Sequence, residues 1–160
     1  MMLELTNLVG LGVTPPNEGS AHRYWRLYIT TVVPMGSMDL CAIQEFELTD
    51  TVGGKTLANI PANGYPENYT NPNYPSYAFN NAAGWWLSQM YVPHWLAYDF
   101  GAPQAVAEFS IVYPGATYGG GWSPTEFKLQ YSDDNASWYD ATSLKTASWG
   151  SITERKSFSV

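Results

Sequence analysis

Cysteine and positive charge are both scarce in this chain of 160 residues. Its single cysteine, Cys41, excludes an internal disulfide, and its apolar neighbours predict a buried, unreactive thiol. Seven lysines and arginines stand against fourteen acids, which gives a net charge of −7. Because phosphate binding needs clustered cations, this balance argues against nucleic acid and against an anionic membrane surface as partners. No window approaches the roughly 18 apolar residues that a membrane-spanning helix needs.

Signatures of catalysis are also missing. His22 and His94 are the only histidines, and neither lies beside a nucleophile motif. The sequence has no G-x-S-x-G, H-E-x-x-H, phosphate-loop or paired-cysteine metal motif. Glu45 and Glu47 share one face of a predicted strand, but their alternation with apolar residues indicates a solvated strand side rather than a catalytic pair. We therefore expect a protein that is not an enzyme.

The first twenty residues differ in composition from the rest. Leucine and valine recur between residues 3 and 13, and residues 14–20 are rich in proline, glycine and asparagine, which predicts a loop or linker. We interpret residues 1–20 as an N-terminal extended arm and residues 21–160 as one domain. The apolar side chains of the arm either pack back on the domain or dock on a partner. No basic residue precedes Arg23, so we expect no secretory signal peptide.

From His22 onward, side chains alternate with a period of two, which is typical of β-strands. In the first strand Trp25, Leu27 and Ile29 point to one side, and the residues between them point to the other. Because short strands and tight turns recur without any long amphipathic helix, the sequence predicts an all-β sandwich or barrel. Further strands are predicted at 42–48, 95–100, 105–113, 126–132, 139–142 and 155–160.

The central segment, residues 59–86, does not follow this pattern. It contains four prolines and four tyrosines interleaved among asparagines. Proline removes a donor from a β-ladder, so this segment is predicted to be a long ordered loop rather than a strand.

Five segments then occur in the order found in a known family. They are 22–29 (HRYWRLYI), 43–50 (IQEFELTD), 78–88 (AFNNAAGWWLS), 95–101 (WLAYDFG) and 132–138 (SDDNASW). Over residues 22–160 the chain resembles the discoidin or coagulation-factor type C domain, a galactose-binding-like jelly roll shared with many carbohydrate-binding modules. The first two segments resemble the version found in bacteriophage tail and virion proteins. The resemblance implies an all-β, jelly-roll β-sandwich.

Most of the matching residues are expected to be structural. Trp86, Trp95 and Trp138 are predicted to fill the space between two sheets, because large rings cover much apolar area. Asp134 and Asn135 suit a hairpin turn that needs a positive φ. Asp99, which precedes Phe100 and Gly101, is expected to fix a turn.

The family often holds a structural calcium ion at the loop that corresponds to residues 78–82. Calcium binds hard oxygen ligands and gains from their formal charge. This chain has the neutral Asn80 where the family has an acid, followed by Ala82 and Ala83. We therefore predict no tight calcium site and no cofactor.

The resemblance also implies a sugar site in loops at one end of the sandwich. Arginine is nearly absent from the predicted loops, whereas aromatic residues are plentiful there. If these loops meet, they form an aromatic surface that can stack on a sugar; the alternative is that they pack against one another. The candidate ligand-binding residues are Trp85, Tyr91 and His94 in one loop and Tyr113, Tyr118 and Trp122 around the glycines at 119–121.

These features favour a non-catalytic phage virion protein, an accessory of the tail or capsid, whose β-sandwich binds a host-surface glycan or polysaccharide. The arm would bind other virion proteins, and the protein would be oligomeric in the assembly. It would be synthesised in the host cytoplasm and reside in the virion. The alternative is a purely structural decoration or cement protein without a glycan ligand, since exposed aromatic residues also serve protein interfaces. A secreted bacterial adhesin is a weaker alternative.

Overall fold

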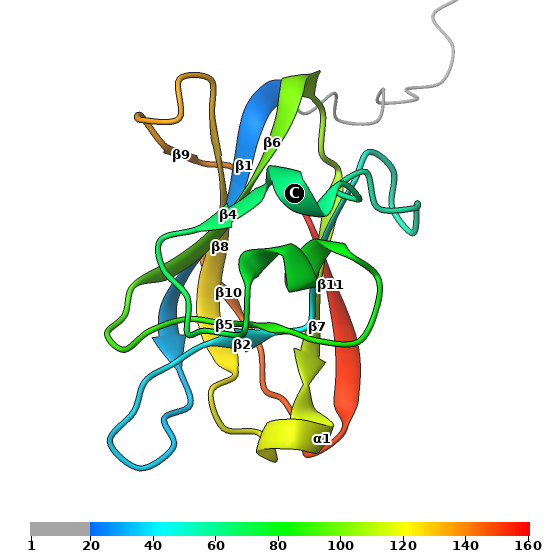
Figure 1. The fold of residues 1–160 in the computed structure, drawn as a ribbon. Coiled ribbons are helices and arrows are strands. Elements are labelled where there is room, and N and C mark those ends of the chain that lie inside the picture. The colour runs from blue at the N-terminus through cyan, green and yellow to red at the C-terminus, as the bar shows by residue number, and fades with distance from the viewer. Residues whose placement is uncertain (1–19) are drawn as a thin grey trace, which may run out of the picture.

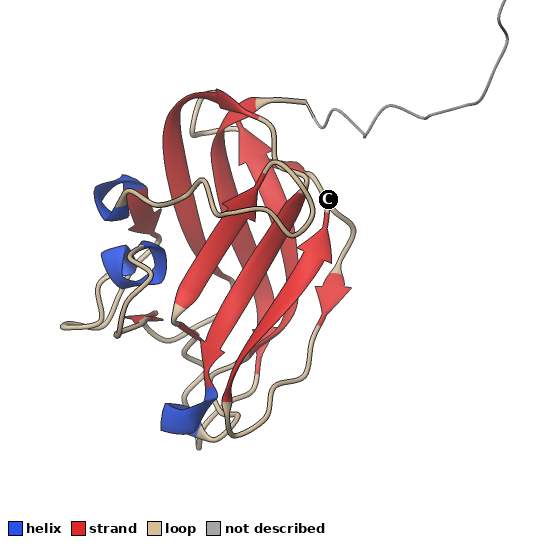
Figure 2. Ribbon diagram, turned by 90° about the vertical axis from the view of Figure 1, so that its right-hand side faces the viewer, coloured by secondary structure: helices blue, strands red, loops and turns tan. Residues whose placement is uncertain are grey.

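The computed structural model describes residues 20–160, and almost all of the predicted arm lies outside that part. Two antiparallel sheets face each other as the layers of a β-sandwich (Figures 1 and 2). The larger sheet has the order β10 (Lys145–Thr146), β8 (Pro124–Ser132), β1 (His22–Val32), β6 (His94–Gln104) and β4 (Gly64–Pro66), with β9 (Tyr139–Asp140) also paired to β8. The smaller sheet has the order β11 (Thr153–Ser159), β7 (Glu108–Pro114) and β3 (Glu45–Thr49).

Short elements complete the described part of the chain. Strands β2 (Ala42–Ile43) and β5 (Trp86–Leu87) pair with each other. Two 3₁₀ helices, η1 (Pro61–Asn63) and η2 (Pro75–Phe79), precede β5, and the single-turn helix α1 (Gly115–Tyr118) follows β7. None of the described helices is long and apolar enough to span a membrane. The predicted all-β sandwich is confirmed.

The alternation predicted for the first strand is confirmed in β1. Trp25, Leu27 and Ile29 are buried between the sheets, while Tyr24 and Arg26 are half-buried on the outer face. Strand β1 is central because it pairs with β6 on one side and with β8 on the other. Residues directly opposite each other in antiparallel strands present their side chains on the same face, so the partners of these residues extend the apolar layer.

Aromatic rings join the two layers. Phe127 of the larger sheet lies 6.2 Å from Phe109 and 5.0 Å from Phe158 of the smaller sheet, measured between ring centroids. Burial of one such side chain contributes about 1.5–3 kcal/mol to folding. Trp86 is fully buried in this core, as predicted. Cys41 is also buried, and burial raises the pKa of its thiol, which confirms the predicted inert cysteine.

The prediction was wrong for Trp95 and Trp138, which are half-buried outside the inter-sheet core. Trp95 lies opposite Tyr28 in the β1–β6 register, and Tyr28 belongs to the outward set of β1. Trp138 follows the hairpin turn and lies against the guanidinium of Arg26. The space between the sheets is filled by Trp25 instead.

The predicted solvent exposure of Glu45 and Glu47 was wrong. Glu45 and Glu47 do share one face of β3, but both are buried rather than solvated. The backbone N–H of Ala82 donates to Glu45 over 3.2 Å, and Arg155 pairs with Glu47 at 2.7 Å. Segments that are distant in sequence therefore cover this face of the strand.

The segment at 59–86 is mostly an ordered loop, as predicted, but Gly64–Pro66 pairs with β6 as a short edge strand. Pro66 is tolerated there because an edge strand has one side without ladder partners. A side chain at Gly64 would place its Cβ 2.1 Å from the ring of Phe79, so the edge strand packs tightly on η2.

The predicted turns are confirmed. The carboxylate of Asp134 accepts hydrogen bonds from the backbone N–H groups of Ala136 and Ser137, and Asn135 has a φ of 57°. The carboxylate of Asp99 accepts from the N–H of Gly101 over 2.7 Å and also forms a bidentate pair with Arg23.

Candidate functional site

Three loops meet at the end of the sandwich that carries α1. They are the 33–40 loop after β1, the 88–93 loop before β6, and the 115–123 segment that begins with α1 (Figure 1). Backbone hydrogen bonds join the first and last of them: the N–H of Trp122 donates to the carbonyl of Val33 over 2.6 Å, and the N–H of Val33 donates to Ser123 over 3.0 Å. The 33–40 loop is therefore joined directly to the 115–123 segment.

Four of the predicted site residues come together here. The ring of Tyr118 lies 5.6 Å from Trp85 and 4.8 Å from Trp122, measured between centroids. Tyr113 lies beneath them, fully buried, and its hydroxyl donates to the carbonyl of Gly121. Burial raises the pKa of Tyr113 to about 12, so its hydroxyl stays protonated at neutral pH. These rings pack loop against loop, and Tyr113 presents no surface to a ligand.

The indole N–H groups of Trp85 and Trp122 are buried without a hydrogen-bond partner among the described residues. The Trp85 indole faces the hydroxyl of Tyr118, but the contact lacks the geometry of a hydrogen bond. Trp122 also has a φ of 60°, which is rare for a bulky residue and costs on the order of 1–3 kcal/mol. This end of the sandwich therefore contains both a strained backbone position and two indole donors without a partner.

Tyr91 is the most exposed of the predicted site residues. Its side chain is 75% exposed, yet its backbone is held at a φ of 84°. The carboxylate of Asp39 accepts the N–H of Tyr91 over 2.7 Å and that of Val92 over 3.3 Å. These backbone hydrogen bonds, the Tyr91 one above all, lower the pKa of Asp39, so it is ionised at neutral pH. The loop thus holds the backbone that carries an exposed ring.

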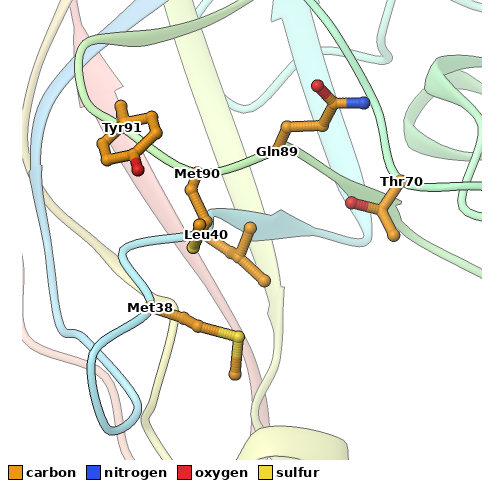
Figure 3. A pocket seen from close by; sticks show the side chains of 6 residues that line it. All are labelled: Met38, Leu40, Thr70, Gln89, Met90 and Tyr91. Carbon is orange, nitrogen blue, oxygen red and sulfur yellow. The ribbon is translucent and has the colours of Figure 1, made fainter.

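An open pocket of about 470 Å³ lies beside Tyr91. In Figure 3, Met90 and Leu40 lie between Tyr91 on one side and Thr70 on the other, and Met38 lies below them. The hydroxyl of Thr70 donates to the carbonyl of Ser88 over 2.8 Å and keeps its acceptor lone pairs. The full lining consists of Met38, Leu40, Thr70, Gln89, Met90 and Tyr91.

His94 lies behind the 88–93 loop and is fully buried. Its Nε2 is 2.6 Å from the carbonyl oxygen of Asp39, and its Nδ1 is 2.7 Å from Oε1 of Glu67. A carbonyl only accepts, so Nε2 must carry a proton, and a second proton must lie between Nδ1 and the carboxylate. His94 therefore ties the loop that holds Tyr91 to two other segments and does not face the pocket.

The pocket lining combines apolar surface with the polar groups of Thr70 and Gln89. It contains no carboxylate, histidine or cysteine. Sequence reasoning found Tyr91 from its aromatic loop but missed the other five lining residues, because methionine, threonine and glutamine at scattered positions carry no sequence signal for a site. Only the folded chain brings these residues together.

The loop that could hold calcium is closed by its own hydrogen bonds. The side-chain oxygen of Asn80 and one carboxylate oxygen of Glu45 both accept from the N–H of Ala82, over 2.9 and 3.2 Å. Residues 20–160 contain no group of three or more histidine, cysteine, aspartate or glutamate side chains that could hold a metal ion. The absence of a tight calcium site stays a prediction.

The fold and the loop-end site define a galactose-binding-like β-sandwich, a class of domain that typically serves as a non-catalytic binding module. The family model described as "NedA-like, galactose-binding domain" matches residues 77–159, just over half of the chain. The chain belongs to this family of coagulation-factor type C domains, which confirms the resemblance to the discoidin type. No curated protein and no solved structure gives a significant match.

Proposed function

We propose that the protein binds a neutral carbohydrate at the pocket beside Tyr91, without catalysis. The observation that carries this proposal is an exposed aromatic ring on a backbone fixed by Asp39. A sugar ring presents apolar C–H groups on one face, which can pack on an aromatic ring, and hydroxyl groups around its edge. Because the Tyr91 loop is held before binding, little conformational entropy is lost when a ligand docks.

The rest of the lining supports the same ligand class. Met38 and Met90 supply adaptable apolar surface, and flexible thioether side chains follow irregular shapes well. Thr70 keeps acceptor lone pairs for a hydroxyl group, and the amide of Gln89 makes one contact of 3.3 Å, to the carbonyl of Tyr69. The lining contains no cation, so a neutral sugar suits it better than an acidic one.

The Tyr91→Ala variant is expected to lose about tenfold or more in affinity for a neutral host-surface polysaccharide, because the stacking surface is removed. Tyr91→Phe should bind nearly as well as the wild type, since the ring remains. Titration followed by heat and tryptophan fluorescence measures both affinities. Tyr139→Ala is the matched control, since Tyr139 is another exposed tyrosine, on β9 and outside the pocket lining. Equal binding by wild type and Tyr91→Ala would refute the pocket as the site.

We propose in addition that the binding module is part of a phage virion, on the tail or the capsid. The support is the resemblance of residues 22–29 and 43–50 to phage tail and virion proteins, together with the apolar composition of the arm at 1–20. The arm would dock on other virion proteins in an oligomeric assembly formed in the host cytoplasm. Deletion of residues 2–19 should abolish incorporation into particles while residues 20–160 remain folded, as measured by particle composition and circular dichroism. Unchanged incorporation would contradict the anchoring role.

One observation favours the alternative of a decoration or cement protein. Large apolar side chains are exposed on the 88–93 loop and on the neighbouring 33–40 loop, and exposed apolar surface can serve a protein interface. In that case neither the wild type nor Tyr91→Ala would bind glycan, and the Tyr91→Ala protein would be incorporated into particles less than the wild type. The exposed side chains on these loops are Val33, Met35, Met38, Met90 and Val92.

A further inference from the structure

A second cluster of aromatic residues lies on the outer face of the larger sheet, around the guanidinium of Arg26. The centre of this guanidinium is 4.2 Å from the ring of Trp138, 5.1 Å from Tyr28 and 5.7 Å from Trp95, measured to ring centroids. Its Nε donates to Oε1 of Gln130 over 2.7 Å. We call these five residues the Arg26 patch. Three different strands and a hairpin converge on it.

The register explains why these residues meet. Arg26 lies opposite Gln130 of β8, and Tyr28 lies opposite Trp95 of β6, so all four side chains leave the same face of the sheet. Trp138 reaches the patch from the hairpin that joins β8 to β9. Because opposite residues in neighbouring strands present one face, this patch is a product of the sheet rather than of flexible loops.

The hairpin is held over the sheet by a second contact. The hydroxyl of Tyr65, on β4, donates to the side-chain oxygen of Asn135 over 2.6 Å. Tyr65 also meets Trp95 edge to face, with centroids 5.9 Å apart. The burial that this cover produces raises the pKa of the Tyr65 hydroxyl. The rings around Arg26 are therefore fixed in position before any ligand arrives.

Arg26 differs from its charged neighbours because it has no acidic partner among the described residues. Arg23 forms a bidentate pair with Asp99, and Lys128 pairs with Asp140 over 2.7 Å. Two further carboxylates, Asp140 and Glu67, attract Arg26 without a direct hydrogen bond to it. Asp140 is bonded to Lys128 and Gln130, and Glu67 is bonded to His94. Arg26 makes one hydrogen bond, through Nε, and its two terminal nitrogens have no hydrogen-bond acceptor within residues 20–160. Partial burial lowers the pKa of Arg26, and it outweighs the opposite effect of Asp140 and Glu67.

We propose that the Arg26 patch is a second binding site, specific for a pyranose sugar that carries a carboxylate. The two terminal nitrogens of Arg26 would donate to the carboxylate, and the sugar ring would pack against the indole of Trp138 or Trp95. A planar guanidinium matches a carboxylate in two parallel hydrogen bonds, which makes the contact both strong and directional. The ligand would supply a carboxylate in direct contact with the terminal nitrogens of Arg26, which no side chain of residues 20–160 does.

The two sites are separate and differ in chemistry. The hairpin that carries Trp138 lies at the opposite end of the sandwich from α1 (Figure 1). The Tyr91 pocket has no cation in its lining, whereas the Arg26 patch contains a cation whose terminal nitrogens have no partner within residues 20–160. A protein with both sites could hold a polysaccharide that contains neutral and acidic sugars at two points, which raises the effective concentration for the second contact.

The test uses the wild-type chain and three trisaccharides: trigalacturonate, α2,8-linked trisialic acid and neutral galactotriose. At least one acid is expected to bind about tenfold or more tightly than galactotriose, and this preference should weaken between roughly 50 and 500 mM salt. Isotope-labelled protein should show shifts of the Trp95 and Trp138 indole N–H signals on titration. The acid that binds identifies the source of the carboxylate. No preference for either acid over galactotriose would overturn the proposal.

Variants then separate binding from support of the fold. Arg26→Gln keeps a planar amide but loses the charge, and it should lose about tenfold or more in affinity for the acid. Lys128→Gln, which removes a positive charge from the same face of the sheet, is the matched control and should leave the acid affinity nearly unchanged. If Arg26→Gln does not fold, the proposal is tested by the affinities of the wild type for the acidic and neutral sugars. A folded Arg26→Gln protein with unchanged acid affinity would show that Arg26 only pins the hairpin.

Discussion

Replacing Glu45 with glutamine is expected to stabilise the protein by about 3 kcal/mol near pH 8 and to change its stability little near pH 4. Glu45 is only 6% exposed, and burial raises the pKa of its carboxyl from 4.5 to about 7. The neighbouring Glu47 raises this pKa further, whereas the N–H groups of Ala82 and Asn81 and the more distant Arg155 lower it. Burial outweighs these donors, so the ionised form is disfavoured in the folded state.

The sign follows from proton binding in the two states. Between about pH 4.5 and 7 the folded protein keeps a proton on Glu45 that the unfolded chain has already released. Stability therefore falls as pH rises through this window, by about 1.4 kcal/mol for each unit of pKa difference. A glutamine at this position stays neutral at every pH and can still accept the N–H of Ala82, so this loss of stability disappears.

Denaturant unfolding of both proteins at about pH 4, 5, 6, 7 and 8 measures the effect. The quantity of interest is the difference between wild type and variant, because aspartates with lowered pKa values, such as Asp99 and Asp140, affect both proteins equally at low pH. Asp50→Asn is the control, since Asp50 is exposed at the end of β3. A difference that stays constant from pH 4 to 8 would show that Glu45 is ionised and well solvated in the folded protein.

Glu45 also shows where prediction from the sequence ends. The alternation of β3 correctly places Glu45 and Glu47 on one face, because the period of a strand is a local property. Whether that face meets water depends on what covers it. Here the loop around Ala82 and Arg155 on β11 cover this face, and nothing in the sequence of β3 predicts either contact.

The outer face of the larger sheet shows the same limit of sequence-based prediction for aromatic residues. Strand β6 carries large rings on both of its faces, with Tyr98 inside and Trp95 outside. Composition predicts that a tryptophan covers apolar surface, and Trp95 does so, but against Tyr65 and Arg26 rather than between the sheets. Only the register with β1 decides which ring enters the core, and register is a tertiary property.

The candidate pocket was partly predictable. An aromatic residue in a loop of a galactose-binding-like sandwich indicates a ligand surface, and Tyr91 fits that expectation by its exposure. Thr70 and Met38 come from two other loops, so their approach to Tyr91 depends on the folded chain. The sequence also gave no sign that His94, expected in the site, would be fully buried behind it.

His94→Gln is expected to lower the free energy of unfolding by about 3 kcal/mol, because the carboxylate of Glu67 and the carbonyl of Asp39 lose a buried donor. One glutamine amide cannot reach both oxygens from the position of the imidazole. The matched control is His22→Gln: His22 also pairs with a carboxylate, Asp133, but that carboxylate is exposed. The carboxylate of Asp133 is 65% exposed and can be solvated by water once the imidazole is gone, so we expect a smaller loss there.

The same substitution should weaken sugar binding at the pocket even though His94 does not line it. The side chain of Asp39 accepts the N–H of Tyr91, and the backbone carbonyl of Asp39 accepts from His94. Loss of the imidazole removes the second of these contacts and therefore leaves Asp39 less firmly held. The folded His94→Gln protein should therefore bind neutral sugar less tightly, with the loss appearing as a larger entropic cost in calorimetry. Backbone amide exchange at Tyr91 and Val92 should accelerate in parallel. Weakened stability with unchanged affinity and unchanged exchange at Tyr91 would show that Asp39 alone fixes the ring.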